Sequence, residues 1–279
     1  MTESRARRPG AAPTGPRTVC VFAVRRTQEP PLPPGLAGHP DGGTLRITPV
    51  GALWAVVQEV PAPPEDGREW CVRTHHAVVT GFAADGEVVP LPAGTVFASA
   101  EEAAAELAAD GPKFDAVLRR LAGRAEWAVR VSFADPPEPA PEDAAGPPPC
   151  GRAYLAQVIG RRQERTRRRA RAAAAAELVD REVGALAEAA VRRDPHGPGT
   201  AGPDRTQVLN AAYLLARERG AELAERVQLL CAEAEFAESE VEIEVTGPWV
   251  AYSFADEAAP PTAGPPAADG TPPVEALIA

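Results

Sequence analysis

Cys71, His75 and His76 are the residues whose types and spacing could do chemistry most directly. Cys71 and His75 are four positions apart, so they would share one face of a helix, and that spacing can hold zinc. A structural zinc site takes four ligands, however, and the other cysteines lie far away in the chain without local partners. His75 could also serve in acid–base chemistry, but no serine or carboxylate constellation accompanies it. We therefore predict no metal site, no cofactor and no catalytic residue.

A run of arginines between Arg161 and Arg171 is a second candidate, because arginines can contact phosphate groups. No aromatic residues are interleaved with these arginines, and acidic residues follow on the same segment from Glu177 onwards. The chain has a net charge of −10, which argues against general binding to nucleic acid or anionic lipid. We interpret the run as a solvated basic face, or as one that docks on an acidic surface, and we expect no nucleic-acid partner.

Glu240, Glu242 and Glu244 could be read as paired carboxylates, but they alternate with apolar residues. A period of two is typical of a strand with one buried and one solvated face. We expect the glutamates to face solvent, where a row of charges discourages pairing with another sheet edge. The chain has no P-loop, nucleophile-elbow or zincin motif either.

Three aromatic residues, Trp249, Tyr252 and Phe254, follow this strand within six positions. Gly247-Pro248 separates them from the alternating segment, and we expect this dipeptide to end the strand, since proline donates no N–H to a ladder. The cluster predicts a corner that clamps the end of a sheet onto the layer behind it. Together with Trp127, in an earlier predicted strand, these are our candidate protein-binding residues.

The positions of proline and glycine, 32 and 24 residues in all, divide the chain into five parts. We predict a disordered basic arm at 1–17, a first α+β domain at 18–134, a proline-rich linker at 135–151, a second α+β domain at 152–254 and a Pro/Ala-rich tail at 255–279. The four cysteines are scattered, as in a reducing cytosol. No apolar leader follows the N-terminal arginines, and no run of about twenty apolar residues exists. We expect a cytoplasmic protein without a membrane span.

The first domain should contain strands and helices on a mainly antiparallel sheet. Strands are predicted at 18–24, 45–48, 53–60, 88–92 and 127–133, with helices at 68–82, from Ser99 to Asp110 and from about Phe114 to Gly123. The second helix begins with a capping box, in which Ser99 accepts the N–H of Glu102 and the Glu102 carboxylate reaches back.

The second domain should contain one long helix, or two abutting ones with a break near Gly184, at 152–194. A strand at 208–215, a helix at 218–236 and a strand at 240–246 follow. The helix at 218–236 is amphipathic, and Leu223, Val227, Leu230 and Cys231 are expected to face inward.

Seven blocks, in the same order along the chain, resemble the GvpF/GvpL family of gas vesicle proteins. They are GALWAVVQEV (51–60), HHAVV (75–79), VVPLPAGTVF (88–97), EWAVRV (126–131), GRAYL (151–155), VLNAAYLL (208–215) and VTGPWVAYSF (245–254). The resemblance covers the chain from about Val19 to Phe254. Two positions depart from it: the family usually has arginine and a bulky residue where Pro92-Ala93 stand, and two prolines where Val250-Ala251 stand.

The resemblance implies a ferredoxin-like first domain, a modified ferredoxin-like second domain with the long helix, and a disordered or extended tail. It also implies an accessory or minor structural protein of gas vesicle assembly, not an enzyme. Such a protein would bind the hydrophobic shell protein GvpA, and other accessory proteins, and would assist nucleation and growth of the vesicle. A ligand-sensing regulatory module, and nucleic-acid binding through the arginine run, are the alternatives that the sequence leaves open.

Overall fold

The computed structural model describes residues 17–61, 68–84, 86–135, 151–195, 205–233, 236 and 240–256. Almost all of the predicted basic arm, of the predicted linker and of the tail lies outside these residues. The chain divides into two compact units at Leu118 and Arg119. Each unit is built around its own antiparallel sheet.

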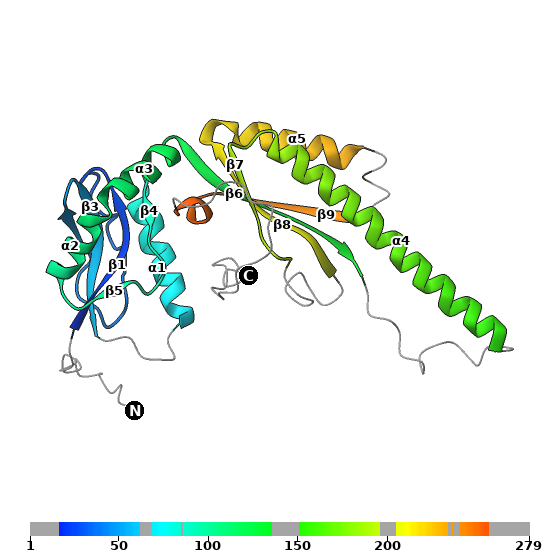
Figure 1. Cartoon of the computed structure of the whole chain (residues 1–279), viewed down its shortest axis with the longest axis horizontal. Helices are drawn as coiled ribbons and strands as arrows, with labels where there is room; N and C mark the ends of the chain where they lie inside the picture. The colour runs from blue at the N-terminus through cyan, green and yellow to red at the C-terminus, as the bar shows by residue number, and fades with distance from the viewer. Residues whose placement is uncertain are drawn as a thin grey trace, which may run out of the picture. The chain divides into compact units, whose positions relative to one another are not determined.

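The first unit contains strands β1 (Arg17–Arg25), β2 (Arg46–Val50), β3 (Leu53–Pro61), β4 (Val89–Pro90) and β5 (Val96–Phe97). Their order is β2-β3-β1-β4, and β5 also pairs with β1. Helices α1 (Arg68–Phe82) and α2 (Ala100–Ala109) lie on opposite sides of this sheet (Figure 1). β1 is therefore covered on both faces, and every residue from Val19 to Arg25 is buried.

The N-terminus of α2 confirms the hydrogen bond predicted for Ser99, but the reciprocal bond from the capping box goes to a different residue. Ser99 Oγ accepts a hydrogen bond from the Glu102 N–H at 3.1 Å, as expected. The Glu102 carboxylate accepts from the Ala98 N–H at 2.7 Å, one residue before the predicted position. Helix α3 (Gly111–Leu121) follows directly and runs across the boundary between the units.

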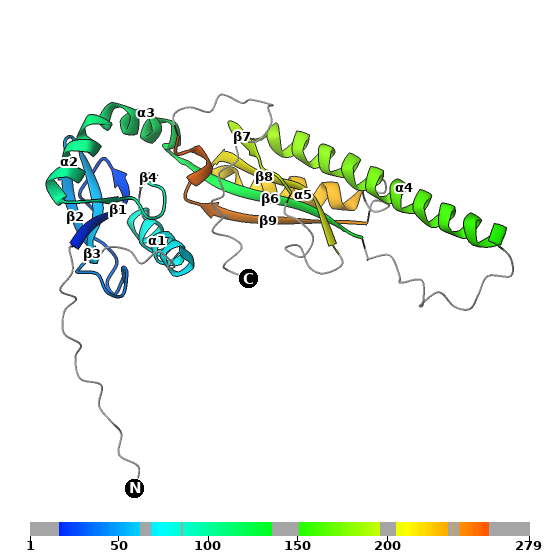
Figure 2. The ribbon, with the colours of Figure 1, turned by 60° about the horizontal axis from the view of Figure 1, so that its bottom comes forward.

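The second unit contains β6 (Arg124–Ala134), α4 (Gly151–Gly184), β7 (Ala189–Arg192), β8 (Arg205–Ala216), α5 (Gly220–Ala232) and β9 (Val241–Trp249). The sheet order is β7-β8-β6-β9, and every neighbouring pair is antiparallel. This is the β-α-β-β-α-β succession of a ferredoxin-like fold. Helices α4 and α5 pack side by side on one face (Figure 2).

The core of the second unit lies between these helices and alternate residues of the two central strands. α4 contributes Ala175, Ala176, Val179 and Val183, and α5 contributes Leu223 and Leu230. Tyr213 of β8 is fully buried, and its hydroxyl donates to Asp180 Oδ1 of α4 at 2.5 Å. Burial and the negative charge of Asp180 raise the pKa of Tyr213.

The structure confirms the predicted α+β class, the antiparallel sheet of the first domain and the long helix of the second, and it shows that the second sheet is antiparallel as well. Each unit departs from the simple ferredoxin pattern. In the first unit, residues 26–45 take the place of the helix between β1 and β2. In the second unit, α4 has 34 residues and extends beyond the sheet that it covers.

The boundary predicted at residue 134 was wrong. β6 was placed in the first domain, but it pairs with β8 along one edge and with β9 along the other. The proline-rich segment after it therefore connects β6 to α4 within one unit. Alternation shows that a strand has one buried face, but it does not show in which sheet that face is buried.

Three smaller expectations in the second unit also fail. The predicted break at Gly184 is present, but residues 189–192 form strand β7 and not helix. Cys231, expected to face inward, is exposed. β9 continues through Gly247-Pro248 as far as Trp249, because the pairing with β6 shifts between Glu126 and Ala128 and accommodates the interruption.

None of the helices in the described ranges is both long and apolar enough to cross a membrane.

Candidate functional site

Glu126 of β6 holds the segment that follows β9. Its side chain is buried, with 6% of its surface exposed. The carboxylate accepts hydrogen bonds from the Ser253 N–H at 2.8 Å and from the Ser253 hydroxyl at 2.6 Å. Arg193 forms an ion pair with Glu126 at 3.3 Å and also donates to Ser253 Oγ. The buried charge is therefore compensated by a cation and two hydrogen bonds, as burial of a carboxylate requires.

The predicted aromatic corner packs against the same place. Phe254 is 4% exposed, and Arg120 donates to its carbonyl oxygen and to that of Asp256. Tyr252 is partly buried, and burial together with the negative charge of Glu126 raises its pKa. Trp249 Nε1 donates to Thr246 Oγ1 at 3.2 Å. The corner clamps the end of the sheet, as the sequence predicted.

Trp127 lies apart from that corner. Residues paired directly across two strands point to the same face, and Trp249 pairs with Glu126, the neighbour of Trp127. Trp127 therefore faces the helices, while Trp249 faces away from them. A Cβ at Gly220 would come within 2.6 Å of the Trp127 ring, and one at Gly247 within 2.9 Å. The indole fits between two glycines, so the four predicted residues do not form one surface.

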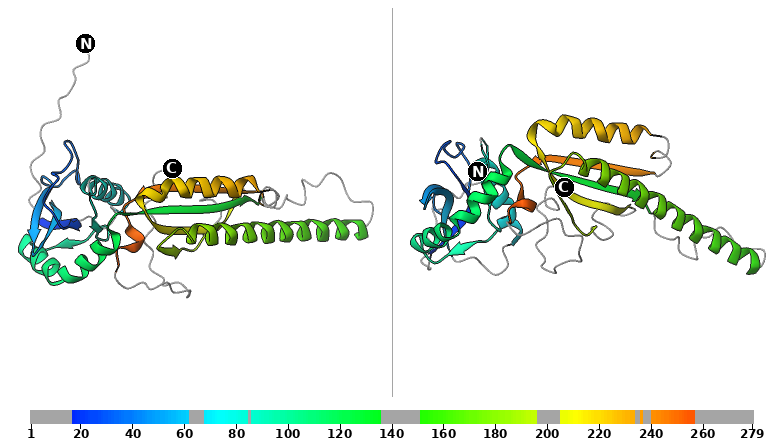
Figure 3. Two further views of the ribbon diagram at one scale, coloured as in Figure 1. Left: turned by 90° about the horizontal axis from the view of Figure 1, so that it is seen from above. Right: turned by 45° about the horizontal axis from the view of Figure 1, so that its top comes forward.

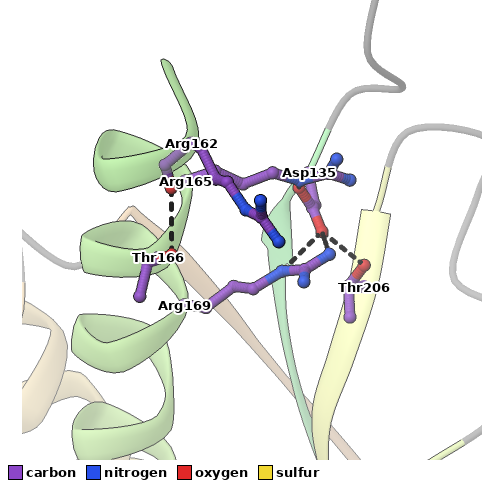
Figure 4. Close-up of polar contacts among 6 residues, drawn as sticks. All are labelled: Asp135, Arg162, Arg165, Thr166, Arg169 and Thr206. Atoms are coloured by element: carbon purple, nitrogen blue, oxygen red, sulfur yellow. Dashed lines mark hydrogen bonds and ion pairs between the residues drawn. The ribbon is translucent and has the colours of Figure 1, made fainter. Parts of the chain in front are cut away.

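The arginine run lies on α4, where Asp135 anchors part of it (Figure 4). Asp135 follows β6, and 5% of its side chain is exposed. Its carboxylate accepts hydrogen bonds from Arg165 Nε and Arg169 Nη2, each at 2.7 Å. A longer hydrogen bond, at 3.4 Å, comes from Thr206 Oγ1. Burial acts to raise the pKa of Asp135, but the hydrogen bonds and charges of the two arginines outweigh it and hold that pKa below its usual range.

The N-terminal part of α4, before the residues that contact Asp135, extends past the sheet (Figure 3). The first buried side chain of α4 is Ala172, and Tyr154, Leu155 and Ile159 are 44%, 59% and 54% exposed. The sequence interpretation recognised the arginines but missed this apolar group. The sequence does show three apolar residues at i, i+1 and i+5 in a proline-free segment. It does not show whether another layer covers them, because that depends on where the sheet ends.

The histidines do not form a reactive site. His75 is buried beside Phe22, with ring centroids 5.5 Å apart, and burial lowers its pKa to about 4. Cys20 Sγ lies 3.8 Å from His39 Nε2 in the same core. The Cys71 side chain is outside the described part of the molecule. Among the described residues, no three His, Cys, Asp or Glu side chains are grouped to hold a metal ion.

Comparison with known proteins places both units in one family. Residues 19–256 match the family described as "Gas vesicle synthesis protein GvpL/GvpF". The chain belongs to the GvpL/GvpF family of gas vesicle proteins. It is 32% identical over 255 residues to gas vesicle protein L of Streptomyces sp. (strain CB03234), an alignment that covers 84% of this chain and 91% of that protein.

Two solved GvpF structures share the fold of this family member. The crystal structure of GvpF from Anabaena sp. PCC7120 aligns with a TM-score of 0.62 at 15% identity, covering 87% of this chain and 98% of that one. GvpF from Microcystis aeruginosa aligns with a TM-score of 0.57, also at 15% identity, covering 86% and 99%. The family is one of gas vesicle proteins, and the resemblance inferred from the seven blocks is confirmed.

Proposed function

We propose that this protein is a cytoplasmic, gas vesicle-associated accessory protein that binds the shell protein GvpA and assists nucleation and growth of the vesicle. The observation that carries the proposal is the family match, which extends through both units from residue 19 to residue 256. A gas vesicle wall needs a subunit with an apolar gas-facing surface, and such a surface aggregates before assembly unless another protein covers it. We propose a binding role without catalysis.

The proposed contact is the corner after β9. Trp249 and Tyr252 are partly exposed there, whereas Phe254 is buried and supports them from behind. Glu126 and Arg120 hold the backbone of this segment, so the two aromatic side chains are presented with little loss of entropy on binding. Large aromatic side chains on a rigid support are typical of binding hot spots.

Co-purification of shell protein with the full chain tests this contact. The double variant Trp249→Ala/Tyr252→Ala should retain less than about a tenth of the bound shell protein. Leu229→Ala removes an exposed apolar side chain from α5, outside both proposed contact surfaces, and should bind normally, which makes it the control. If the double variant folds and binds as much shell protein as the parent protein does, the corner only packs against the rest of the unit and is not the binding site.

The role in assembly needs a separate measurement. Deleting the gene in a strain that makes gas vesicles should lower the number of vesicles while the shell protein is still synthesised. Restoring the full-length gene should restore vesicles, and restoring the double variant should not. A wild-type vesicle count in the deletion strain would refute the assembly role, whatever the binding result.

A further inference from the structure

We infer that the N-terminal half of α4, residues 152–171, is a docking helix for an acidic, amphipathic helix of another protein. This stretch, here called the α4 arm, is separate from the corner after β9. From Arg152 to Glu164 only Val158 is partly covered, and every other side chain is exposed.

The α4 arm carries an apolar stripe with no cover among the described residues. Successive helical residues are separated by roughly 100°, so Tyr154, Leu155, Val158 and Ile159 fall within a sector of roughly 140°. Single exposed aliphatic side chains are ordinary on protein surfaces, but a group of this kind on a helix that projects from its sheet is typical of an interaction site. The sector is as wide as the contact face that one helix offers another.

The charge of the α4 arm specifies the partner. Its arginines are Arg152, Arg161, Arg162, Arg165, Arg167, Arg168, Arg169 and Arg171, and Glu164 is its only acidic residue. Eight arginines against one glutamate give a formal charge of +7 in a chain of net charge −10.

Only part of this positive charge is neutralised inside the protein. Arg165 and Arg169 pair with Asp135, and Arg168 pairs with Glu240. For Arg161, Arg162 and Arg167, the described residues provide no ion pair. A partner that covers the stripe therefore needs carboxylates beside its apolar residues, because an uncompensated arginine at an interface is costly.

The arrangement disfavours three other occupants. Two α4 arms would repel each other, since both carry the same large positive charge. A helix that lies on an anionic membrane separates apolar and basic residues around its circumference. On the α4 arm they are separated along the axis: apart from Arg152, the arginines begin at Arg161, after the stripe has ended at Ile159, and Arg162, Arg165 and Arg169 fall in the same sector of the helix as the stripe. Nucleic acid would use the arginines but would leave the aliphatic stripe uncovered.

Fluorescence anisotropy with the full chain and three synthetic helical peptides tests the proposal. The probe peptide has leucines at helical i, i+3, i+4 and i+7 spacing, flanked by glutamates. In the first control peptide lysines replace the glutamates, and in the second serines replace the leucines. The glutamate–leucine peptide should bind at least about tenfold more tightly than either control, and its affinity should fall as salt is added.

Two double variants locate the contact. Leu155→Ser/Ile159→Ser and Arg161→Glu/Arg162→Glu should each weaken binding of the glutamate–leucine peptide about tenfold or more, and the second should improve binding of the lysine peptide. All four side chains are exposed, so circular dichroism should be unchanged. Arg73→Glu, an exposed arginine of α1, is the matched charge control and should have no effect.

Several outcomes would overturn the inference. One is a glutamate–leucine peptide that binds no better than the controls, or that binds both double variants as well as the parent. Another is binding to duplex DNA, or to vesicles that contain phosphatidylglycerol, that is tighter than binding to the glutamate–leucine peptide and that the Arg161→Glu/Arg162→Glu variant loses. A dimer in sedimentation that the Leu155/Ile159 variant abolishes would assign the stripe to a second copy instead.

Discussion

Arg169 of α4 contacts Asp135 through two nitrogens, with Nε at 3.1 Å and Nη2 at 2.7 Å from the same carboxylate oxygen. Asp135 directly follows β6, and Arg169 lies about one helical turn before Ala172, the first buried residue of α4. The pair therefore marks the place where the helix stops packing on its sheet and becomes an arm.

Asp135→Asn should lower the free energy of unfolding of the second unit by about 1–3 kcal/mol. The substitution preserves shape but removes the charge that Arg165 and Arg169 surround. Urea denaturation, followed by circular dichroism, measures the change. Glu244→Gln is the control, because the Glu244 side chain, which pairs with Arg130, is 55% exposed, and such a pair should contribute about 0–1 kcal/mol.

The same pair predicts an acid-dependent loss of stability. The pKa of Asp135 is lower in the folded protein than in the unfolded chain, so its contribution is fully present above the unfolded value of about 3.9 and disappears as the pH falls through the folded value. The difference in stability between the parent and Asp135→Asn should be constant near neutral pH and should shrink below about pH 4. A difference that grows on acidification would contradict the assigned ion pair.

His75 predicts a second pH dependence, in the first unit. Its pKa falls from 6.5 to about 4 on folding, because burial disfavours the protonated ring. The unfolded chain therefore binds the extra proton, and stability should be complete above about pH 6.5 and decrease as the pH falls towards 4. Replacing His75 with Gln should flatten the dependence in this window, as measured by the urea midpoint at each pH. An equally steep slope in the variant would assign it to other groups, such as His39 in the same core.

Glu126→Gln should loosen the corner after β9 and lower the pKa of Tyr252. Gln cannot compensate Arg193, and it provides one acceptor oxygen where Ser253 now uses two. Removing the negative charge beside Tyr252 also favours its phenolate. Spectrophotometric titration of the parent and the variant measures the shift, and Tyr252→Phe identifies which transition belongs to this residue. An unchanged Tyr252 titration would mean that burial alone sets its pKa.

Gly220→Ala should destabilise the second unit by about 1–3 kcal/mol, because the new Cβ would come within 2.6 Å of the Trp127 ring. Thermal unfolding measures the loss. Adding Trp127→Phe removes the obstructing ring, so the double variant should lose less than the two single variants together. Gly160→Ala, in open space within α4, should instead stabilise the protein by about 0.5–1 kcal/mol.

The elements of this fold and its family could be predicted from local patterns. The strands β6, β8 and β9, the Ser99 cap and the aromatic corner at Phe254 all appear where the sequence places them. Such features depend on neighbouring residues in the chain, whose propensities and periodicity are visible without the fold.

Tertiary structure decided which elements share a sheet and which side chains remain uncovered. β6 belongs to the second sheet because its two edges pair with strands that lie far away in the sequence, and its own alternation would be the same in either sheet. Three apolar residues of α4 have the residue types of a core, yet they are exposed because α4 extends past the end of its sheet near Asp135: Tyr154, Leu155 and Ile159. Burial depends on what lies opposite a side chain, and that is a property of the assembled fold, not of the segment.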